Sequence, residues 1–480
     1  MSRVAAIIGG GVIGGGWAAR FLLNGWDVRV YDLDPEAPRK IGEVLTNARR
    51  ALPSLYDKAM PVEGQLTYVS SIKDAVTGAT WIQESVPERL SIKQSTFAEI
   101  QAHASADALI GSSTSGFKPS ELQEGAVNPS QIFVAHPFNP VYLLPLVEVV
   151  PSAKTSADVA ARAQSLLTSL GMKPLMVRKE IDAHIADRFL EAVWREGLWL
   201  VKDGIATTEE IDDAIRFGFG LRWAQMGLFE TYRVAGGEAG MKHFMAQFGP
   251  ALKWPWTKLM DVPEFTDELV DLIASQSDAQ SGHMTIRELE RLRDDNLVGI
   301  MRSLRKTGSG AGGVIIAHEA AFPPSPAIDL PVTVRRQVPQ TWTDYNGHMN
   351  ETHYLEAGAQ ATDTFMEMIG ADAAYIASGN SYFTVETHIR HLDEVHEGAM
   401  IEITTQVLVG EGKKLHLFHR MFGPNGVQIA TCETFLLHTD LQTRRSAPPL
   451  PHIASRLEAF AEAHASMQRP DGAGRYVGER

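Results

Sequence analysis

Residues Val4 to Asp32 read VAAIIGGGVIGGGWAARFLLNGWDVRVYD, the stretch with the clearest structural pattern in the chain. Its first five residues are all apolar, as in a buried strand of a parallel sheet. Six residues with the pattern G-x-G-x-x-G follow, and a helical stretch then runs from Trp17 to Asn24, where Gly25 ends it. A second apolar strand, Val28 to Tyr31, ends at Asp32. The pattern predicts a strand–helix–strand unit that binds a dinucleotide.

Each part of this loop has a predicted role. The first glycine makes a tight turn, the second lets the backbone approach a pyrophosphate, and the third lets the helix pack closely on the strand. Asp32 is predicted to bind the adenosine ribose hydroxyls and to repel a 2′-phosphate, which favours NAD over NADP. A glycine-rich turn without a nucleotide is the alternative, and the acid in register argues against it. The predicted cofactor-binding residues here are Gly9, Gly11, Val12, Ile13, Gly14 and Asp32.

Strand-like and helical segments continue to alternate after this unit. The apolar segments are Trp81-Ile82, Leu109-Ile110 and Ile132 to Val134, and helical stretches lie between them. The alternation predicts a doubly wound parallel sheet, whose ligands bind at the carboxyl ends of its strands. Ser115 and His136 follow two of these segments. The serines and threonine at 112–114 are better explained as a cap for the next helix, so Ser115 is the candidate for holding a substrate oxygen.

Residues Ala135 to Pro151, AHPFNPVYLLPLVEVVP, predict a turn between two strands. A hairpin here would bring Glu148 back beside His136. A carboxylate on one ring nitrogen fixes the tautomer and orientation of a histidine and stabilises its imidazolium, which suits a base that takes a proton from an alcohol. The alternative is a solvent-facing histidine and an edge-strand glutamate without a shared role.

Three motifs, GSSTSG, AHPFNP and LVEVVP, together with the glycine loop resemble the 3-hydroxyacyl-CoA dehydrogenase family over about residues 1–320. The resemblance implies that His136 and Glu148 are the catalytic pair and that Ser115 lies on the substrate side. It also implies that Glu88 and Lys93 lie on the nicotinamide side.

One position departs from that family pattern. The Asn at the start of the next helix corresponds here to Asp187, which precedes Arg188. An ionised Asp cannot donate a hydrogen bond to a carbonyl, so the change argues against an acyl-CoA as the alcohol substrate. IQESVPE and GLRWAQMGLFETYRVAGGEAG resemble the branch that acts on small polar 3-hydroxy acids, carnitine most closely and gulonate next.

From Asp182 the pattern becomes helical, which predicts an all-α domain at 181–320. The resemblance implies that this domain closes over the cofactor and makes a dimer contact. Carnitine carries a quaternary ammonium, which aromatic faces can hold. Trp223 and Phe248 rank first for this role, and Arg222 or Arg188 is a candidate for the substrate carboxylate. The other aromatic candidates, any of which could instead be core residues, are Trp194, Phe229, Tyr232 and Phe244.

Lys306 to Pro331 is rich in Gly, Ser and Pro, and it predicts a linker, placed at 321–331 between domains. Beyond it, one helix from about Tyr354 to Ile369 and four long strands predict an α+β hot-dog domain at 332–460, followed by a frayed tail at 461–480. The first domain, of the α/β Rossmann type, is placed at 1–180.

The segment DYNGHMNETHY, which begins at Asp344, resembles the 4-hydroxybenzoyl-CoA thioesterase group of the hot-dog fold. The resemblance implies that Asp344 is a nucleophile or base and that Asn346 and His348 complete the site. Backbone N–H groups of 347–350 are further candidates, for polarising a thioester carbonyl. The alternative is a turn that only caps the helix. Histidines and acids at 388–396 are interpreted as a charged turn, so no metal is expected.

Composition limits the class of protein. With 480 residues the chain is expected to form about three domains. Its net charge of -14 gives it no electrostatic reason to bind nucleic acid or an anionic membrane. A single cysteine excludes an internal disulfide, and the strand at Val4 leaves no room for a signal peptide, so the cytoplasm is expected.

Taken together, the sequence and its resemblances predict a homodimer whose dehydrogenase part oxidises carnitine with NAD. The resemblance also implies that the thioesterase part hydrolyses an acyl-CoA, namely betainyl-CoA. One rival is a 3-hydroxyacyl-CoA dehydrogenase fused to its own thioesterase. Another is a 3-hydroxyacyl-CoA or gulonate dehydrogenase whose hot-dog part catalyses nothing and only dimerises or senses an acyl-CoA.

Overall fold

The computed structural model describes residues 3–56, 60–235, 240–248, 257, 264, 266–322, 330–475 and 477. The chain divides into two compact units. The first contains residues 1–22, 26–45 and 64–317, and the second contains 23–25, 46–63 and 318–480.

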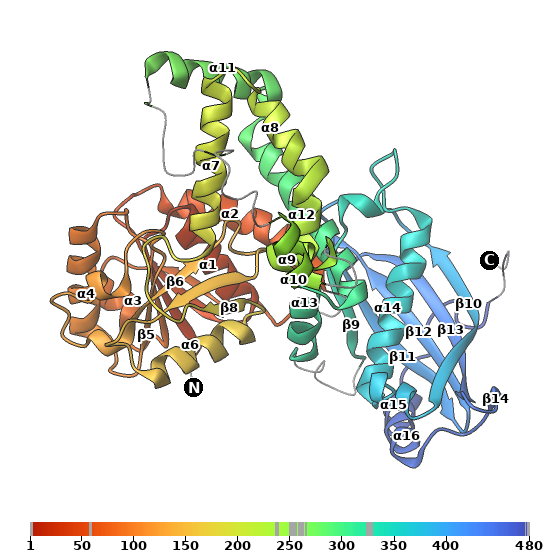
Figure 1. The fold of residues 1–480 in the computed structure, drawn as a ribbon. Coiled ribbons are helices and arrows are strands. Elements are labelled where there is room, and N and C mark those ends of the chain that lie inside the picture. Colours follow the sequence, from red (N-terminus) through yellow and green to blue (C-terminus); the bar gives the residue numbers. More distant parts are fainter. Residues whose placement is uncertain are drawn as a thin grey trace. The chain divides into compact units, whose positions relative to one another are not determined.

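An eight-stranded sheet forms the centre of the first unit, with the strand order β3-β2-β1-β4-β5-β6-β7-β8 (Figure 1). The order reverses direction between β1 and β4, and such a switch point is where doubly wound sheets bind ligands. The apolar residues of β1 and β4 are buried, as the continuous hydrophobic runs predicted. The strands are β1 (Val4–Ile8), β2 (Asp27–Tyr31), β3 (Leu66–Tyr68), β4 (Trp81–Glu84), β5 (Leu109–Ser112), β6 (Ile132–Pro137), β7 (Leu146–Val150) and β8 (Lys173–Met176).

Helices join these strands, as the alternating pattern predicted. They are α1 (Val12–Leu23), α2 (Ala37–Ala51), α3 (Ile72–Val76), α4 (Leu90–His103), α5 (Pro119–Leu122) and α6 (Ala157–Ser169). The core between sheet and helices includes Ile8, Ile82, Phe97, Ile110 and Val134.

One strand of this sheet runs against its neighbour. β6 and β7 are antiparallel, whereas β7 and β8 are parallel. In the β6–β7 register His136 lies directly opposite Glu148, so the predicted hairpin is confirmed.

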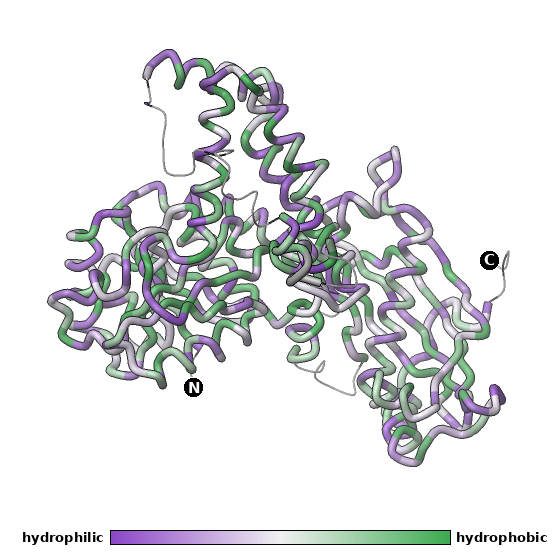
Figure 2. Tube along the Cα trace, viewed as in Figure 1, coloured by the Kyte–Doolittle hydropathy of each residue, from purple (hydrophilic) through white to green (hydrophobic). Residues whose placement is uncertain are grey.

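The chain then becomes helical. α7 covers Ala186–Lys202, within the region where the sequence predicted helices. Thr207 caps α8 in a capping box with Glu210. In Figure 2 the tube of α7 changes between green and purple along its length, so this helix carries both hydrophobic and hydrophilic residues. The helices that follow are α8 (Thr208–Ala214), α9 (Gly220–Ala235), α10 (Gly240–Phe248), α11 (Asp267–Ser281), α12 (Ile286–Thr307) and α13 (Ala311–Ala320), with a π-helix at Ile215–Phe219 between α8 and α9.

The predicted linker from Lys306 is wrong in its first part, because α13 occupies Ala311–Ala320. Gly308 and Gly310 have positive φ angles and turn the chain between α12 and α13, so these glycines end one helix and precede another. Buried Ile315 anchors α13. The prolines of the predicted linker, Pro323, Pro324 and Pro326, lie outside the described residues.

An antiparallel sheet with the order β10-β13-β12-β11-β9 forms the second unit, and β14 pairs with β13. This is the curled sheet with one long helix that the hot-dog pattern predicted. The strands are β9 (Val332–Gln337), β10 (Asn380–His391), β11 (Met400–Glu411), β12 (Lys414–Phe422), β13 (Gln428–Asp440) and β14 (Arg445–Ser446). Three helices complete the unit: α14 (Glu351–Ile369), α15 (Ala373–Ala377) and α16 (Pro451–Ala465).

Close packing holds α14 to the sheet. Buried residues recur along one face of the helix, among them Tyr354, Ala361 and Phe365. A Cβ at Gly358 would lie 2.7 Å from Cys432 Sγ, so the helix approaches β13 more closely than a larger residue allows.

The C-terminal tail differs from its prediction. α16 extends to Ala465, and its His464 is buried and accepts a hydrogen bond at Nδ1 from the Val407 N–H, at 2.9 Å. Ile453 and Leu457 anchor the helix in the core. A short helix held mainly by these contacts gives a weak periodic signal in sequence. Among the described residues, no helix is both long and apolar enough to cross a membrane.

A buried polar network lies inside the second unit. The side chain of His419 is fully buried, and its ring nitrogens pair with Thr362 Oγ1 at 2.9 Å and Thr405 Oγ1 at 2.8 Å. Thr405 Oγ1 lies 2.8 Å from Thr333 Oγ1, so the network joins α14 to β9, β11 and β12. Burial lowers the pKa of His419 from 6.5 to about 3.

We therefore expect acid to destabilise the second unit through His419. The folded state keeps this ring neutral down to about pH 3, whereas the unfolded chain protonates it below about pH 6.5. Stability should therefore fall as the pH drops through this window, by up to ~1.4 kcal/mol per pH unit. Urea unfolding at several pH values should show a shallower decline for His419→Gln. The half-buried His388 lies on β10, outside this network, so His388→Gln should follow the wild type, and equal slopes for all three proteins would contradict the assignment.

Candidate active sites

The glycine loop has the geometry that its three predicted roles require. Gly9 has a φ of +102°, and a Cβ there would lie 2.5 Å from the Ser85 carbonyl oxygen. A Cβ at Gly14 would lie 1.8 Å from the Gly9 carbonyl oxygen, which explains the close approach of α1 to the loop. A Cβ at Gly11 would meet no atom within 4 Å, so this side of the loop is open for a pyrophosphate. Val12 and Ile13 begin α1, whose N-terminus favours an anion.

Asp32 follows β2 and is tied to the same loop. Its Oδ2 accepts a hydrogen bond from the Gly10 N–H, and its Oδ1 accepts one from the Asp34 N–H at 2.6 Å. The carboxylate is thereby fixed beside the glycine loop. Its predicted contact with a ribose stays a prediction.

Lys93 and Glu88 form part of a chain of charges. The Lys93 ammonium is 1% exposed and lies 2.9 Å from Glu84 Oε1 and 3.1 Å from Glu88 Oε2. Burial tends to raise the pKa of Glu88, but hydrogen bonds from Thr114 and Lys93 and the charge of Lys93 outweigh it and hold the pKa below its usual value. Burial raises the pKa of Glu84. The sequence analysis did not assign Glu84 a role, although this residue ends β4 beside the switch point.

The predicted catalytic pair is in contact. His136 Nδ1 lies 3.0 Å from Glu148 Oε2, and both side chains are buried. Ser115 Oγ lies 3.2 Å from the other ring nitrogen, His136 Nε2. If the carboxylate accepts from Nδ1–H, Nε2 carries the lone pair and faces the Ser115 hydroxyl. This is the tautomer that a base acting at Nε2 needs.

Glu148 is held as a carboxylate although it is buried. Burial tends to raise its pKa, but hydrogen bonds from His136, from the Ala186 N–H and from the Ile185 N–H lower it below the usual value. The two backbone groups donate to Oε1 at 2.9 and 2.8 Å. Since they belong to the start of α7, the helix terminus also favours the negative charge.

Asp187 lies on the Nε2 side of the His136 ring. Its Oδ2 is 3.6 Å from His136 Nε2, and burial raises its pKa. Arg188 follows it but is exposed, and the described contacts do not bring it to His136.

The predicted aromatic residues fall into separate groups. Trp223 packs on Phe219 with ring centroids 4.6 Å apart. Phe248 packs on Phe244, which stacks on Tyr232. Trp194 and Phe229 are more than half exposed, and Arg222 is exposed as well. The described ring contacts do not join these groups to His136.

Two residues beside His136 had no predicted role. Phe138 packs on His136 with centroids 5.0 Å apart, and its place within the quoted AHPFNP motif was a usable signal. The His184 ring lies 5.5 Å from that of His136, is fully buried, and donates from Nε2 to the Thr114 carbonyl oxygen at 3.2 Å.

His184 is held under unusual conditions. Burial lowers its pKa, and the described structure gives its Nδ1 no hydrogen-bond partner. Its φ is +50°, and that of Ala183 is +57°, a region that non-glycine residues adopt at a cost. Strain and an unpaired buried acceptor next to a base are features of functional sites. No sequence pattern indicated them.

In the second unit, the turn that begins at Asp344 precedes α14. Asp344 Oδ1 accepts hydrogen bonds from the Asn346 N–H at 2.8 Å and the His348 N–H at 3.3 Å. Asn350 caps α14 by accepting from the Thr352 N–H. The three predicted residues are therefore brought together in one turn, which is also the geometry of the simple capping alternative.

The proposed oxyanion role of the backbone at 347–350 is wrong. The N–H groups of these four residues donate, in order, to the Asp344 carbonyl, Asp344 Oδ1, the Val395 carbonyl and the Trp342 carbonyl. The turn folds back on its own acceptors, so these groups are not available to a thioester. A hollow beside the turn is lined by Met349, Glu351, Tyr354, His391, Leu392, Asp393 and Glu394.

Three family models match the chain. Residues 4–181 match the 3-hydroxyacyl-CoA dehydrogenase NAD binding domain, and residues 184–267 match the C-terminal domain of that dehydrogenase. Residues 338–457 match the thioesterase-like superfamily. The chain is thus an NAD-binding dehydrogenase of the 3-hydroxyacyl-CoA type combined with a thioesterase-like hot-dog domain.

Curated relatives extend over the whole chain. A protein of Ruegeria pomeroyi named L-carnitine dehydrogenase/betainyl-CoA thioesterase is 66% identical and covers 98% of each chain. One of the same name from Agrobacterium fabrum is 56% identical over 98% of this chain and 97% of its own. An L-carnitine dehydrogenase of Mesorhizobium japonicum is 61% identical over 64% of this chain. This chain belongs to the L-carnitine dehydrogenase/betainyl-CoA thioesterase family.

A solved structure supports the dehydrogenase fold. The crystal structure of 5-formyl-3-hydroxy-2-methylpyridine 4-carboxylic acid 5-dehydrogenase, an NAD+ dependent dismutase, has a TM-score of 0.54 and is 27% identical. It covers 63% of this chain and 99% of its own.

Proposed function

We propose that the first unit oxidises L-carnitine to 3-dehydrocarnitine with NAD. The observation that carries the proposal is the relation to the Ruegeria protein, which spans both chains at 66% identity. The contact of His136 with Glu148 and Ser115 supplies a base at the place where the sheet binds its cofactor.

In the proposed mechanism, the substrate hydroxyl lies between Ser115 Oγ and His136 Nε2. NAD, when bound, supplies the acceptor for the hydride that leaves C3 of the substrate. His136 takes the hydroxyl proton at Nε2, and Glu148 stabilises the imidazolium that forms. The carboxylate can do this because three hydrogen-bonding groups and a helix terminus already favour its charge.

Asp187 supports a small cationic substrate. It places a carboxylate 3.6 Å from His136 Nε2. An acyl-CoA substrate would need a hydrogen-bond donor for its carbonyl oxygen at this position, and an ionised carboxylate cannot donate. Phe138 adds an aromatic ring beside the base. We propose, as the sequence predicted, that Trp223 and Phe248 contact the substrate ammonium. Arg188 is proposed to contact the substrate carboxylate.

The substitution His136→Gln tests the base. It should lower kcat for carnitine about 100- to 10,000-fold, because the substitution removes the proton acceptor, while the Kd for NADH changes little. NADH formation at 340 nm and NADH fluorescence titration measure the two quantities. His103→Gln, at the exposed end of α4, is the control. Turnover of 3-hydroxybutyryl-CoA or gulonate in place of carnitine would reject the substrate and keep the mechanism.

For the second unit we propose hydrolysis of betainyl-CoA, with Asp344 as nucleophile or base and Asn346 and His348 beside it. The carboxylates of Glu351, Asp393 and Glu394 in the adjacent hollow suit an acyl group with a fixed positive charge. Burial raises the pKa of Tyr354 in this hollow, and the negative charges of Asp393 and Glu394 raise it further.

The substitution Asp344→Asn distinguishes a catalytic role of the Asp344 carboxylate from a purely structural role in its turn. Asn can accept the same backbone hydrogen bonds in such a turn but lacks the charge. The variant should fold normally and lose at least about 100-fold in thiol release from betainyl-CoA. Asp372→Asn, which changes the cap of α15, is the matched control and should keep the activity. Full activity of Asp344→Asn, or a preference for long-chain acyl-CoA, would contradict the assignment.

We also propose that the chain is a homodimer through its helical region. Phe189, Leu190, Trp194 and Phe229 are each more than half exposed, and a soluble surface rarely leaves so many large apolar side chains close in sequence uncovered. Sedimentation equilibrium of the full chain should give twice the chain mass, and Trp194→Glu should shift the equilibrium to monomer. Gln225→Glu adds the same charge at a polar exposed position of α9 and should leave the dimer intact.

A further inference from the structure

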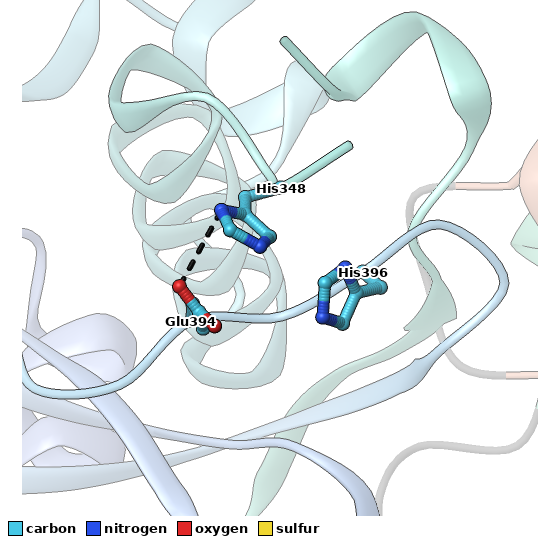
Figure 3. A group of neighbouring side chains, drawn as sticks. All are labelled: His348, Glu394 and His396. Atoms are coloured by element: carbon cyan, nitrogen blue, oxygen red, sulfur yellow. Dashed lines mark ion pairs between the residues drawn. The ribbon is translucent and has the colours of Figure 1, made fainter. Parts of the chain in front are cut away.

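Three potential metal ligands converge in the second unit, two of them close in sequence and the third 46 residues before them. His348 belongs to the turn before α14, and Glu394 and His396 belong to the loop between β10 and β11. One ligand atom from each lies within 4.8 Å of those of the other two. Figure 3 shows the Glu394 carboxylate below the His348 ring, joined to its Nδ1 at 3.4 Å, with the His396 ring beside both.

The backbone holds these residues in register. His348 and His396 form an antiparallel β-bridge, and the Met349 N–H donates to the Val395 carbonyl at 2.8 Å. Val395 is buried in the core, whereas its neighbours Glu394 and His396 are exposed. The buried valine thus anchors the loop between the two candidate ligands.

Hydrogen bonding prepares His396 for a metal. Its Nδ1 lies 3.2 Å from the Gly347 carbonyl oxygen, which can only accept, so Nδ1 carries the proton. The lone pair is then on Nε2. Metal-binding histidines are usually oriented in this way, with the second nitrogen donating to a carbonyl or carboxylate.

We propose that His348, Glu394 and His396 bind a divalent transition-metal ion, Zn²⁺ by preference. Two imidazoles and one carboxylate are the ligand set of open zinc sites, which keep a further position for water or a ligand. Tetrahedral zinc with bonds of about 2.1 Å needs ligand atoms about 3.4 Å apart. The partly exposed side chains can close the remaining gap by rotation.

The proposed metal site shares His348 with the proposed thioesterase turn, and it leaves other charges of that region unused. Glu394 also lines the hollow beside the turn. With this residue bound to the ion, Glu351 and Asp393 remain there as carboxylates for a cationic group. Because the ion would tie the turn that carries Asp344 to the β10–β11 loop, binding should also stabilise this part of the second unit.

The sequence alone gave no indication that His348, Glu394 and His396 lie together. The histidines and acids of 388–396 were interpreted as a charged turn, and His348 was assigned to the thioesterase motif. Only the β-bridge brings His348 to Glu394 and His396.

Calorimetric titration of the chelator-treated full chain with Zn²⁺ alone tests the proposal. The wild type should show one site that His396→Ala and Glu394→Gln each weaken at least about tenfold, since each removes one of three ligands. His388→Ala and Glu386→Gln, on the neighbouring strand β10, are matched controls and should bind as the wild type does. Circular dichroism confirms that all four variants fold.

Competing ions and thermal unfolding complete the test. Mg²⁺ in excess should not displace Zn²⁺, because nitrogen ligands disfavour it. Zn²⁺ should raise the Tm of the wild type and of both controls, and not that of the ligand variants. Unchanged Zn²⁺ affinity in His396→Ala and Glu394→Gln, or equal competition by Mg²⁺, would overturn the site. Neither readout depends on thioester hydrolysis, so the result is independent of the proposed function.

Discussion

The contact between His136 and Glu148 depends on a single change of strand direction. Because β7 returns antiparallel to β6, two residues twelve positions apart become direct partners in the register. The second carboxylate oxygen then receives two N–H groups from the start of α7. The same buried charge therefore contacts the His136 ring and the start of the helical region, so a change in this hairpin would disturb both.

Local patterns were enough to predict most of this architecture. The glycine loop, the His136 hairpin and α7 each carry their signal within a short stretch, where strand sterics and helical periodicity act directly. The contacts of Glu84 with Lys93, and the strained backbone at His184, depend on how distant segments pack. Gly308 and Gly310 were misinterpreted because composition cannot distinguish a flexible glycine from one that ends a helix with a positive φ.

The turn at Asp344 shows a second limit of motif reading. A short polar motif can be typical of a catalytic site and also satisfy its own backbone. Here the N–H groups of 347–350 all donate within the fold, so they are not free to form an oxyanion hole. Only the hydrogen-bond partners, which the letters of the motif do not contain, decide between these roles.

A quaternary ammonium imposes the same demand on any site that binds it. It has no N–H to donate, so hydrogen-bond acceptors cannot orient it, and only negative charge and aromatic surface remain. Near His136 the chain offers Asp187 and Phe138, and in the hollow beside Asp344 it offers Glu351, Asp393 and Tyr354. Each place thus combines at least one carboxylate with an aromatic ring, and the two combinations come from unrelated elements. Under the proposed function, two reactions on trimethylammonium compounds need such a combination twice.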